Sequence, residues 1–391
     1  MRQKVLYLAQ LKDSSGYSVA ARGYFKLLTE MTDEFDVKCV NVSFENKVDN
    51  HNWIDSFIID KPAFADWSDS GFILLWHMPA PTVEMIGRFD KTPNIALFVK
   101  ELFKKCSKNI QITAWETDRL PKEWLKVYER LKPFKVIVPS EWNKETFAKY
   151  IDCDCIPHAV TINTTNTKES RYQTLLKDKF VFLSVSQWSY RKGFDLLLKS
   201  YLTEFVNNQD VVLVLKTYVT NMEGNASPTQ QSKLIRQYVE KVRNELFYDE
   251  KVIQPNIFLV TNMLAEDHLN DLYESSDVYV TTTRGEGFGL TIAEASYKGL
   301  PVIAPNKGGH VDFLGDDYYK IESHSTPCVN MPSYSSLGNF FEPSITSCKS
   351  KMREVYELQD NNKSFKKPTK HTEKFLQHSG IKELLKKAIK N

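Results

Sequence analysis

The stretch from Thr281 to Gly309 constrains the fold more strongly than any other part of this sequence. It begins as the end of an apolar strand and crosses a loop with three glycines at alternate positions. It then continues as a helix and a second short strand. A glycine-rich turn between a strand and a helix forms an anion site, because backbone N–H groups and the positive helix end converge there. The stretch therefore predicts an anion site at the carboxyl end of a strand.

Two carboxylates flank this predicted anion site. Glu286 lies in the glycine loop, and Glu294 lies on the helix that follows. Carboxylates repel phosphate, so we expect both to accept hydrogen bonds from hydroxyl groups of a ligand, such as those of a sugar or a ribose. The structural alternative is an ordinary loop acid at Glu286 and a solvated helix acid at Glu294.

Strand and helix patterns alternate along the whole chain, which indicates the α/β class with parallel sheets. A chain of 391 residues is longer than a single hydrophobic core usually supports, so its length predicts two domains. The polar residues 163–178 are the expected linker between them. We expect two Rossmann-like, doubly wound domains facing a central cleft, with ligands at the carboxyl ends of the strands. The expected domains are residues 1–165 and 166–371, and a C-terminal helix at about 372–391 is expected to pack back onto the first.

Composition and charge exclude several classes of protein. The net charge of +2 implies no general affinity for polyanions, although residues 88–149 hold 14 basic against 8 acidic side chains. The tail from Phe341 is basic and is expected to be helical. Six cysteines without regular spacing indicate reduced thiols, and no apolar run approaches the roughly 18 residues of a membrane-spanning helix. Because the N-terminus also lacks signal-peptide anatomy, we expect a cytoplasmic protein without a transmembrane anchor.

Several motifs occur together in one order along the chain. The glycine loop and its helix read GEGFGLTIAEA, and GLPVIAPNKGGHVDFL follows shortly after. An Arg-Lys-Gly helix start stands earlier, in QWSYRKGFDLLLKSYL, and the first half contains WETDRLPKEW, VIVPSEWNKETF and IPHAV. Together these segments resemble the Glu-x7-Glu signature and flanking landmarks of retaining glycosyltransferases with the GT-B fold, and they are most similar to glycosyltransferase family 4.

The resemblance implies a donor site in the second domain. It assigns contact with the donor-sugar hydroxyls to Glu286, contact with the ribose to Glu294, and binding of the pyrophosphate to Lys192. A cation there can neutralise the charge that grows on the pyrophosphate as the glycosidic bond breaks; the alternative for the Arg-Lys pair is a solvated turn. The other expected donor contacts are Gly16, Tyr17, Arg191, Leu264, Gly287, Phe288, Gly289, Leu290 and Thr291.

In the first domain, His77 and Glu116 follow apolar strands and are candidate catalytic groups, beside Glu286 and Lys192 in the second. Many relatives carry a His-Asp pair where this chain has Trp115 and Glu116, so the group that activates the acceptor is left open. A structural histidine with its hydrogen bonds satisfied is the alternative for His77.

The expected function is transfer of a sugar from a UDP- or GDP-sugar to a hydroxyl acceptor, with retention of configuration and by a same-face mechanism. The scheme that the resemblance implies requires no metal ion or other cofactor, and Asp152-Cys153-Asp154 reads as a connecting turn. The acceptor stays open among a glycan, a small molecule, a lipid-linked glycan and a modified base of viral or phage DNA. The alternative from another class is a non-catalytic nucleotide-binding module.

Overall fold

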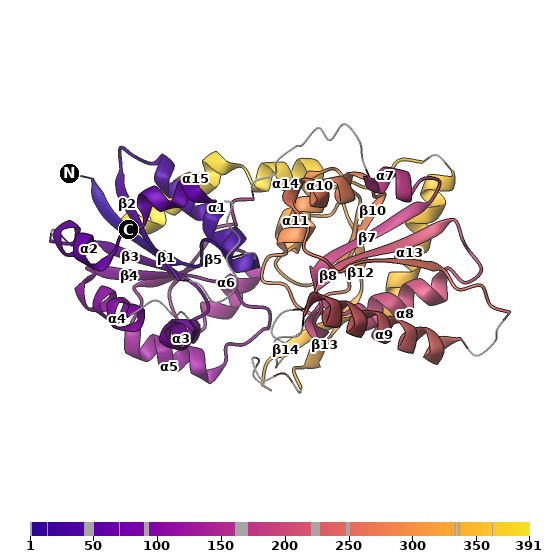
Figure 1. Cartoon of the computed structure of the whole chain (residues 1–391), viewed down its shortest axis with the longest axis horizontal. Helices are drawn as coiled ribbons and strands as arrows, with labels where there is room; N and C mark the ends of the chain where they lie inside the picture. The colour runs from indigo at the N-terminus through magenta and orange to yellow at the C-terminus, as the bar shows by residue number, and fades with distance from the viewer. Residues whose placement is uncertain are drawn as a thin grey trace. The chain divides into compact units, whose positions relative to one another are not determined.

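A computed structural model of the chain describes residues 2–13, 15–42, 51–69, 71–89, 94–160, 171–219, 227–247, 251–329, 331, 334, 337–361 and 363–391. The chain forms two compact units (Figure 1), which we describe separately. The first unit comprises Met1–Thr161, Pro327–Asn339 and Leu376–Asn391. The second comprises Ile162–Thr326 and Phe340–Phe375.

The first unit is built on a six-stranded parallel sheet with the order β2-β1-β3-β4-β5-β6. The strand order reverses between β1 and β3, and such sheets bind ligands outside the carboxyl ends of the strands at this point. Strand β3 is buried along its whole length, which agrees with its apolar sequence. The ranges are β1 Gln3–Ala9, β2 Phe35–Asn41, β3 Ile73–His77, β4 Lys108–Ile112, β5 Lys135–Val138 and β6 Cys153–Cys155.

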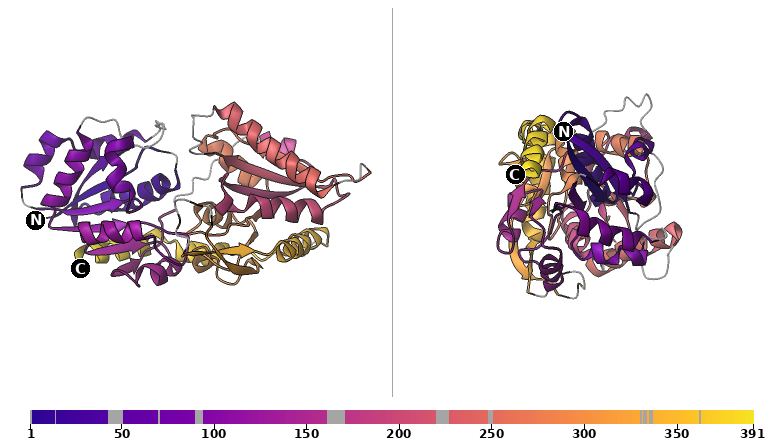
Figure 2. Two further views of the ribbon diagram at one scale, coloured as in Figure 1. Left: turned by 90° about the horizontal axis from the view of Figure 1, so that it is seen from below. Right: turned by 90° about the vertical axis from the view of Figure 1, so that its left-hand side faces the viewer.

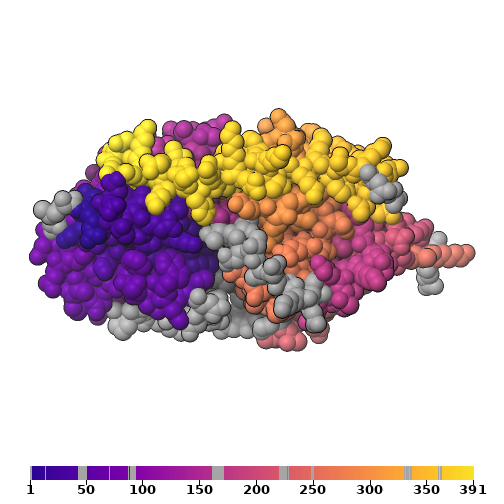
Figure 3. All heavy atoms as spheres, turned by 90° about the horizontal axis from the view of Figure 1, so that it is seen from above, coloured from indigo at the N-terminus to yellow at the C-terminus, as the bar shows by residue number. Residues whose placement is uncertain are grey.

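Helices cover both faces of this sheet. Helices α1 and α15 pack on the face that carries Val5 and Tyr7 of β1. Figure 3 shows α15, in yellow, lying along the indigo part of this unit. Helices α2 to α6 pack on the face that carries Leu6 and Leu8. The ranges are α1 Gly16–Glu30, α2 Lys61–Trp67, α3 Thr82–Phe89, α4 Ile95–Lys105, α5 Lys122–Leu131, α6 Glu141–Phe147 and α15 His378–Lys390, and the 3-10 helix η1 is Asn52–Phe57.

The second unit repeats this plan with the strand order β12-β11-β10-β7-β8-β9, again with parallel pairing. Here the order reverses between β10 and β7, so the loops that follow these two strands are the expected place for a ligand. The ranges are β7 Phe180–Gln187, β8 Val211–Tyr218, β9 Asn256–Val260, β10 Val278–Val280, β11 Val302–Pro305 and β12 Tyr319–Ile321.

Two helical layers also enclose the second sheet (Figure 1, Figure 2). Helices α8, α9 and α13 pack on one face, against Leu213 and Leu215 of β8 and their neighbours. Helices α7, α10, α11 and α14 lie on the other face, and α12 contacts α11 and α14. The ranges are α7 Arg171–Leu175, α8 Phe194–Glu204, α9 Pro228–Leu246, α10 Glu266–Glu274, α11 Leu290–Tyr297, α12 Val311–Leu314, α13 Ile345–Asp360 and α14 Thr369–Phe375.

Two local expectations differ from the structure. Residues Asn339–Pro343 form strand β14, which pairs with β13 (Ser323–Pro327) in a two-stranded sheet, so the tail is not yet helical at Phe341. Helix α13 starts only at Ile345, because Ser344 caps it by accepting a hydrogen bond from the backbone of Ser347. Cys153–Cys155 is strand β6 and not part of a connecting turn, because it completes the edge of the first sheet beside β5.

Candidate functional site

Two loops of the second unit meet where β7 and β10 end. The first contains the 3-10 helix η2, Tyr190–Lys192, and the second is the glycine loop. The backbone N–H of Arg284 donates to the carbonyl oxygen of Arg191 at 2.7 Å. The guanidinium of Arg191 donates in return to the carbonyl oxygen of Gly285 at 2.6 Å, across 94 positions of sequence. These hydrogen bonds fix the two loops as one surface.

Two glycines make this close approach possible. Gly193 has φ +69°, and a Cβ atom there would lie 1.9 Å from the carbonyl oxygen of Thr282. Gly289 has φ +97°, and a Cβ atom there would lie 2.9 Å from Ile292 Cδ1. No other residue fits either position without moving the backbone or the side chain beside it. The glycines therefore serve the packing of the loops as well as any ligand.

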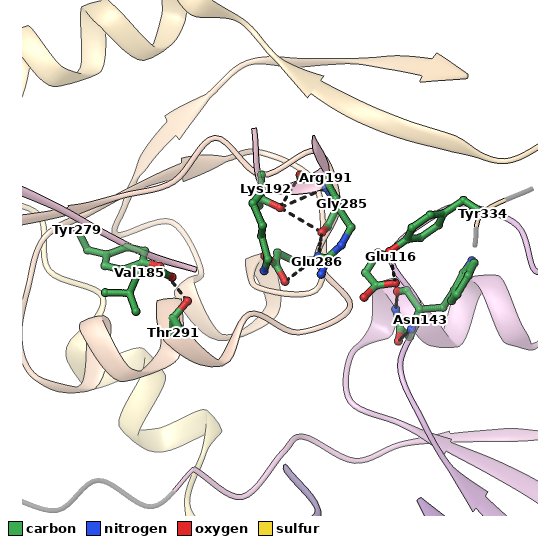
Figure 4. A network of polar contacts seen from close by, with 12 residues as sticks. Glu116, Asn143, Val185, Arg191, Lys192, Tyr279, Gly285, Glu286, Thr291 and Tyr334 are labelled. Atoms are coloured by element: carbon green, nitrogen blue, oxygen red, sulfur yellow. Dashed lines mark hydrogen bonds and ion pairs between the residues drawn. The ribbon is translucent and has the colours of Figure 1, made fainter. Parts of the chain in front are cut away.

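Glu286 is 8% exposed and forms ion pairs with two cations of the first loop (Figure 4). Its carboxylate accepts a hydrogen bond from Lys192 Nζ and lies 3.6 Å from Arg191 Nη1. Burial by itself would raise the pKa of Glu286, but the charges of Lys192 and Arg191 outweigh it and hold the pKa below its ordinary value. Glu286 is therefore an ionised hydrogen-bond acceptor at neutral pH.

Helix α11 begins directly after the glycine loop, with Gly289 as its N-cap and no side chain capping it. The hydroxyl of Thr291, in the first turn, lies 2.9 Å from the hydroxyl of Tyr279. Tyr279 in turn donates to the carbonyl oxygen of Val185 at 3.1 Å. These contacts hold the start of the helix against the end of β7. Its positive end thus lies beside the loops of Lys192 and Glu286, where it favours an anion.

Glu294 has a different electrostatic environment from Glu286. It lies half-buried on α11, and its carboxylate accepts a hydrogen bond from the hydroxyl of Tyr273 at 3.0 Å. Burial raises the pKa of Glu294 to about 7, and the hydrogen bond and the nearby Lys298 oppose this shift only in part. One glutamate of the pair is thus firmly ionised, and the other titrates near neutral pH.

The other expected donor contacts lie on separate elements. Leu264 is half-buried in the loop between β9 and α10. Gly16 and Tyr17 form the first turn of α1 in the first unit, where Ser15 caps the helix. The Tyr17 hydroxyl donates to the carbonyl oxygen of Ala114 at 2.9 Å, which ties α1 to the loop after β4. Phe288 packs in the second unit at 5.1 Å from the ring of Phe313.

His77 is the last residue of β3 and is only 1% exposed. Its Nδ1 lies 2.7 Å from the hydroxyl of Tyr7, and the ring of His158 stacks at 6.2 Å. Burial, followed by the neighbouring His158, holds the pKa of His77 well below its ordinary value, so the imidazole is neutral at pH 7. Across the described ranges, the Nε2 of His77 finds no hydrogen-bond partner. Only a ligand group that reaches a buried position could contact this nitrogen.

Glu116 lies in the loop after β4 and meets a distant part of the first unit. Its carboxylate accepts a hydrogen bond from the hydroxyl of Tyr334 at 3.2 Å (Figure 4), and the ring of Tyr334 lies 4.9 Å from that of Trp115. Asp118 accepts from both the backbone and the side-chain nitrogen of Asn339, at 2.7 and 2.9 Å. The segment Pro327–Asn339 thus packs against the loop that carries Glu116.

Arg284 is a residue of this site that the motif reading missed. It is 3% exposed, and its guanidinium makes two hydrogen bonds to Asp195, at 2.9 and 2.7 Å. It also donates to Glu342 at 2.9 Å and to the carbonyl oxygen of Tyr190 at 2.6 Å. Its charged group lies 3.8 Å from the centre of the Tyr190 ring. The sequence signal was a single arginine between the small residues Thr283 and Gly285 at the start of the glycine loop.

Two further properties bear on the expected chemistry. Among the described residues, no group of three or more His, Cys, Asp or Glu side chains is placed to hold a metal ion. The expectation of metal independence stays a prediction. Within the same residues, we find no helix that combines the length and the apolar surface needed to cross a bilayer.

Comparison with known families places both loops in one domain. Residues 166–327 match the family model described as "Glycosyl transferases group 1". This range runs from before β7 to the end of β13 and contains Lys192, Glu286 and Glu294. The match covers most of the second unit.

Two curated proteins match shorter segments. The mannosylfructose-phosphate synthase of Agrobacterium fabrum is 27% identical over 129 residues, which are 33% of this chain and 26% of that protein. The sulfoquinovosyl transferase SQD2 of Arabidopsis thaliana is 40% identical over 63 residues, which are 16% of this chain and 12% of that protein. The matches thus span about a quarter or less of these relatives.

Solved structures resemble the chain over its whole length. Anabaena HepE, solved in complex with UDP-glucose, is 14% identical with a TM-score of 0.64, and the match covers 100% of both chains. The sucrose-phosphate synthase of Thermosynechococcus elongatus is 13% identical with a TM-score of 0.63, over 99% of this chain and 98% of that one. At such identities the likeness concerns the fold, and it confirms the predicted GT-B fold with two Rossmann-like units.

Proposed function

We propose that this protein is a retaining glycosyltransferase that takes its sugar from a nucleoside diphosphate sugar. The observation that carries the proposal is the buried contact of Glu286 with Lys192 and Arg191, beside the start of α11. These groups supply the two properties that such a donor needs. The cations and the helix end attract the diphosphate, and the ionised carboxylate accepts hydrogen bonds from sugar hydroxyls.

We take a UDP-sugar as the first candidate donor. The structural relative from Anabaena was solved with UDP-glucose, which supports a uracil nucleotide without naming the sugar. In this scheme Lys192 and Arg191 exchange their contact with Glu286 for contact with the diphosphate. Glu294 accepts a hydrogen bond from the ribose, and Leu264 lies against the base.

The proposed reaction breaks the bond between the anomeric carbon and the diphosphate oxygen. The acceptor oxygen bonds to the same face of that carbon, and the acceptor proton passes to the departing phosphate. Lys192 and the amides at the start of α11 stabilise the charge that grows on the leaving group. The proposed same-face transfer forms no covalent glycosyl–enzyme intermediate, so Glu286 serves as a hydrogen-bond acceptor for the sugar and not as a nucleophile. No step in this scheme uses a metal ion or another cofactor.

The acceptor-side groups are assigned to the first unit. Glu116 is the better candidate for contact with the acceptor hydroxyl, because it is half-buried in a loop and not enclosed in the core. His77 is neutral and buried, so it can act only on a group that enters the space above β3. The acceptor is proposed only as a hydroxyl compound.

Thermal melting with UDP-, GDP- and ADP-sugars tests the proposal directly. A ligand that binds only the folded protein raises the melting temperature, so one nucleotide should raise it and the others should not. Lys192→Met should abolish the rise, whereas Lys241→Met, on the exposed surface of α9, should leave it unchanged. No rise with any of these compounds would contradict the proposed donor class.

The reaction itself is tested with the nucleotide sugar that binds. Transfer to water or to an added hydroxyl acceptor should release the nucleoside diphosphate, and the first-formed product should keep the donor's anomeric configuration by NMR. An inverted product would refute retention. Binding without any turnover across acceptors would favour the non-catalytic alternative.

A further inference from the structure

Lys216 is a buried cation at the carboxyl end of β8 in the second unit. It is 6% exposed, although lysine is seldom enclosed in a protein. In the parallel sheet it lies opposite Val185 of β7 on one side and Val260 of β9 on the other. It therefore occupies an interior strand of the sheet, next to the strand whose loop carries Lys192.

The alternation of side chains places Lys216 on the same sheet face as the start of α11. Leu215 belongs to the core packed under α8, α9 and α13, so Lys216 points to the opposite face. Tyr279 is on that opposite face too, because its neighbours Val278 and Val280 belong to the same core as Leu215.

Val185 connects Lys216 to the candidate donor site. Lys216 pairs in register with Val185, and the carbonyl oxygen of Val185 accepts the hydrogen bond from Tyr279. Tyr279 also contacts Thr291 in the first turn of α11, at 2.9 Å. The lysine and the positive helix end thus lie on one face at the carboxyl edge of the sheet, where doubly wound sheets bind nucleotides.

Within the described residues, no carboxylate forms an ion pair with Lys216. The ring of Tyr218 lies beside it, with its centre 5.5 Å from Nζ. A ring at that distance offsets only part of the cost of removing an ammonium group from water. Burial accordingly lowers the pKa of Lys216 to about 8. Binding of an anionic ligand beside Lys216 would therefore offset the cost of burying its charge.

We propose that Lys216 binds a phosphate group of the donor's diphosphate, as a cation additional to Lys192 and Arg191. This inference rests on the proposed function, since it assumes a nucleoside diphosphate ligand at this edge of the sheet. The ligand would supply the missing negative charge, so binding and burial of the lysine would support each other. Burial of this lysine without a bound anion would cost some stability.

Calorimetric titration of Lys216→Met tests this assignment. Methionine keeps an apolar stem of similar length and removes only the charge. We titrate UDP, GDP and ADP, and the nucleosides uridine, guanosine and adenosine, into the wild type and the variant at one salt concentration. The diphosphate that the wild type prefers should bind the variant about 10- to 100-fold more weakly. The affinity for the matching nucleoside should be unchanged.

Two additional measurements separate binding from a structural role. The ligand-free Lys216→Met protein should melt at the same temperature as the wild type or higher, because a desolvated charge has been removed. Lys216→Arg keeps the charge and should retain the diphosphate affinity within about threefold. Lys241→Met, at an exposed position, is the matched control and should change nothing.

The possible failures are distinguishable. If the wild type prefers one diphosphate and Lys216→Met binds it equally well, the assignment of Lys216 is wrong and the proposed function stands. An equal loss for diphosphate and nucleoside would also overturn it, as would an arginine variant as weak as the methionine one. If the wild type binds none of the diphosphates, the proposed function fails together with this inference.

Discussion

Replacing Arg284 by methionine removes a guanidinium that joins three segments of the second unit. These segments are the loop at Tyr190, the first turn of α8 at Asp195, and strand β14 at Glu342. Arg284 itself lies in the glycine loop, so the substitution also removes one of the hydrogen bonds that join this loop to the loop at Tyr190. Methionine can fill much of the apolar volume but can form none of the hydrogen bonds.

The expected loss of stability follows from the burial of the groups left behind. The side chain of Arg284 is 2% exposed, and those of Asp195 and Glu342 are 24% and 27% exposed. Removing one partner of a buried ion pair costs about 3–5 kcal/mol, because the remaining charge stays unpaired. The two acids can reach some water, so we expect the lower part of that range, about 3 kcal/mol in the free energy of unfolding of the second unit.

Urea unfolding followed by far-ultraviolet circular dichroism measures this effect. The matched control is Arg353→Met, whose side chain is 36% exposed and pairs with Glu204. A pair of this kind contributes about 1 kcal/mol or less, so the control should unfold almost as the wild type does. A loss below about 1 kcal/mol for Arg284→Met, or equal losses for the two variants, would refute the argument from burial.

The same variant tests how Arg284 acts on the donor site. Because Arg284 holds the loop of Lys192, its loss should weaken donor binding even at temperatures where the variant is fully folded. Arg284→Lys keeps the charge but cannot bridge both acids and the carbonyl oxygen, so it should recover only part of the affinity. Unchanged affinity in a folded methionine variant would mean that the loop keeps its position without the arginine.

Three further predictions concern the donor site. Lys192→Met and Glu286→Gln should each lower kcat by about 100-fold or more without loss of circular dichroism, and wild-type turnover in either would remove that residue from the site. The pKa of Glu294 rises from 4.5 to about 7 on folding, so its contribution to stability is complete below pH 4.5 and disappears as the pH rises through 7. From pH 4.5 to 8 the wild type should therefore lose up to about 3 kcal/mol relative to Glu294→Gln in urea unfolding, and parallel curves would refute the shift. Activity should persist after dialysis against a chelator, and a loss restored by manganese would show that a metal takes part.

The architecture was predictable because it is expressed in short-range patterns. Apolar runs of strand length alternate with helical stretches, and the GT-B fold expected from them and from the motifs is confirmed. The sequence also predicted that Arg191, Lys192 and Glu286 belong to one donor site, although it did not predict their direct contact. Each residue stands in a loop after a parallel strand, and β7 and β10 are neighbours in the sheet. The catalytic and binding roles given to these residues stay predictions.

Some features could not be read from local pattern. The helix expected from Phe341 begins later because β14 finds a partner in β13, and a pairing between strands is invisible in one strand's own sequence. The grouping of Pro327–Asn339 with the first unit is of the same kind. It brings Tyr334 to Glu116 across 218 positions of sequence.

The Thr281–Gly309 stretch by itself determined a strand, a glycine loop and a helix start suited to an anion, since backbone geometry there depends on adjacent residues. Only the tertiary structure decided the charge state of the acids and bases around it. Glu286 is ionised because two cations reach it from another loop, and Glu294 titrates near neutrality because α11 is packed against the sheet. Lys216 is buried because it lies on an interior strand of the sheet, and no carboxylate among the described residues forms an ion pair with it. Burial and long-range pairing set a pKa, and both arise only when distant segments come together.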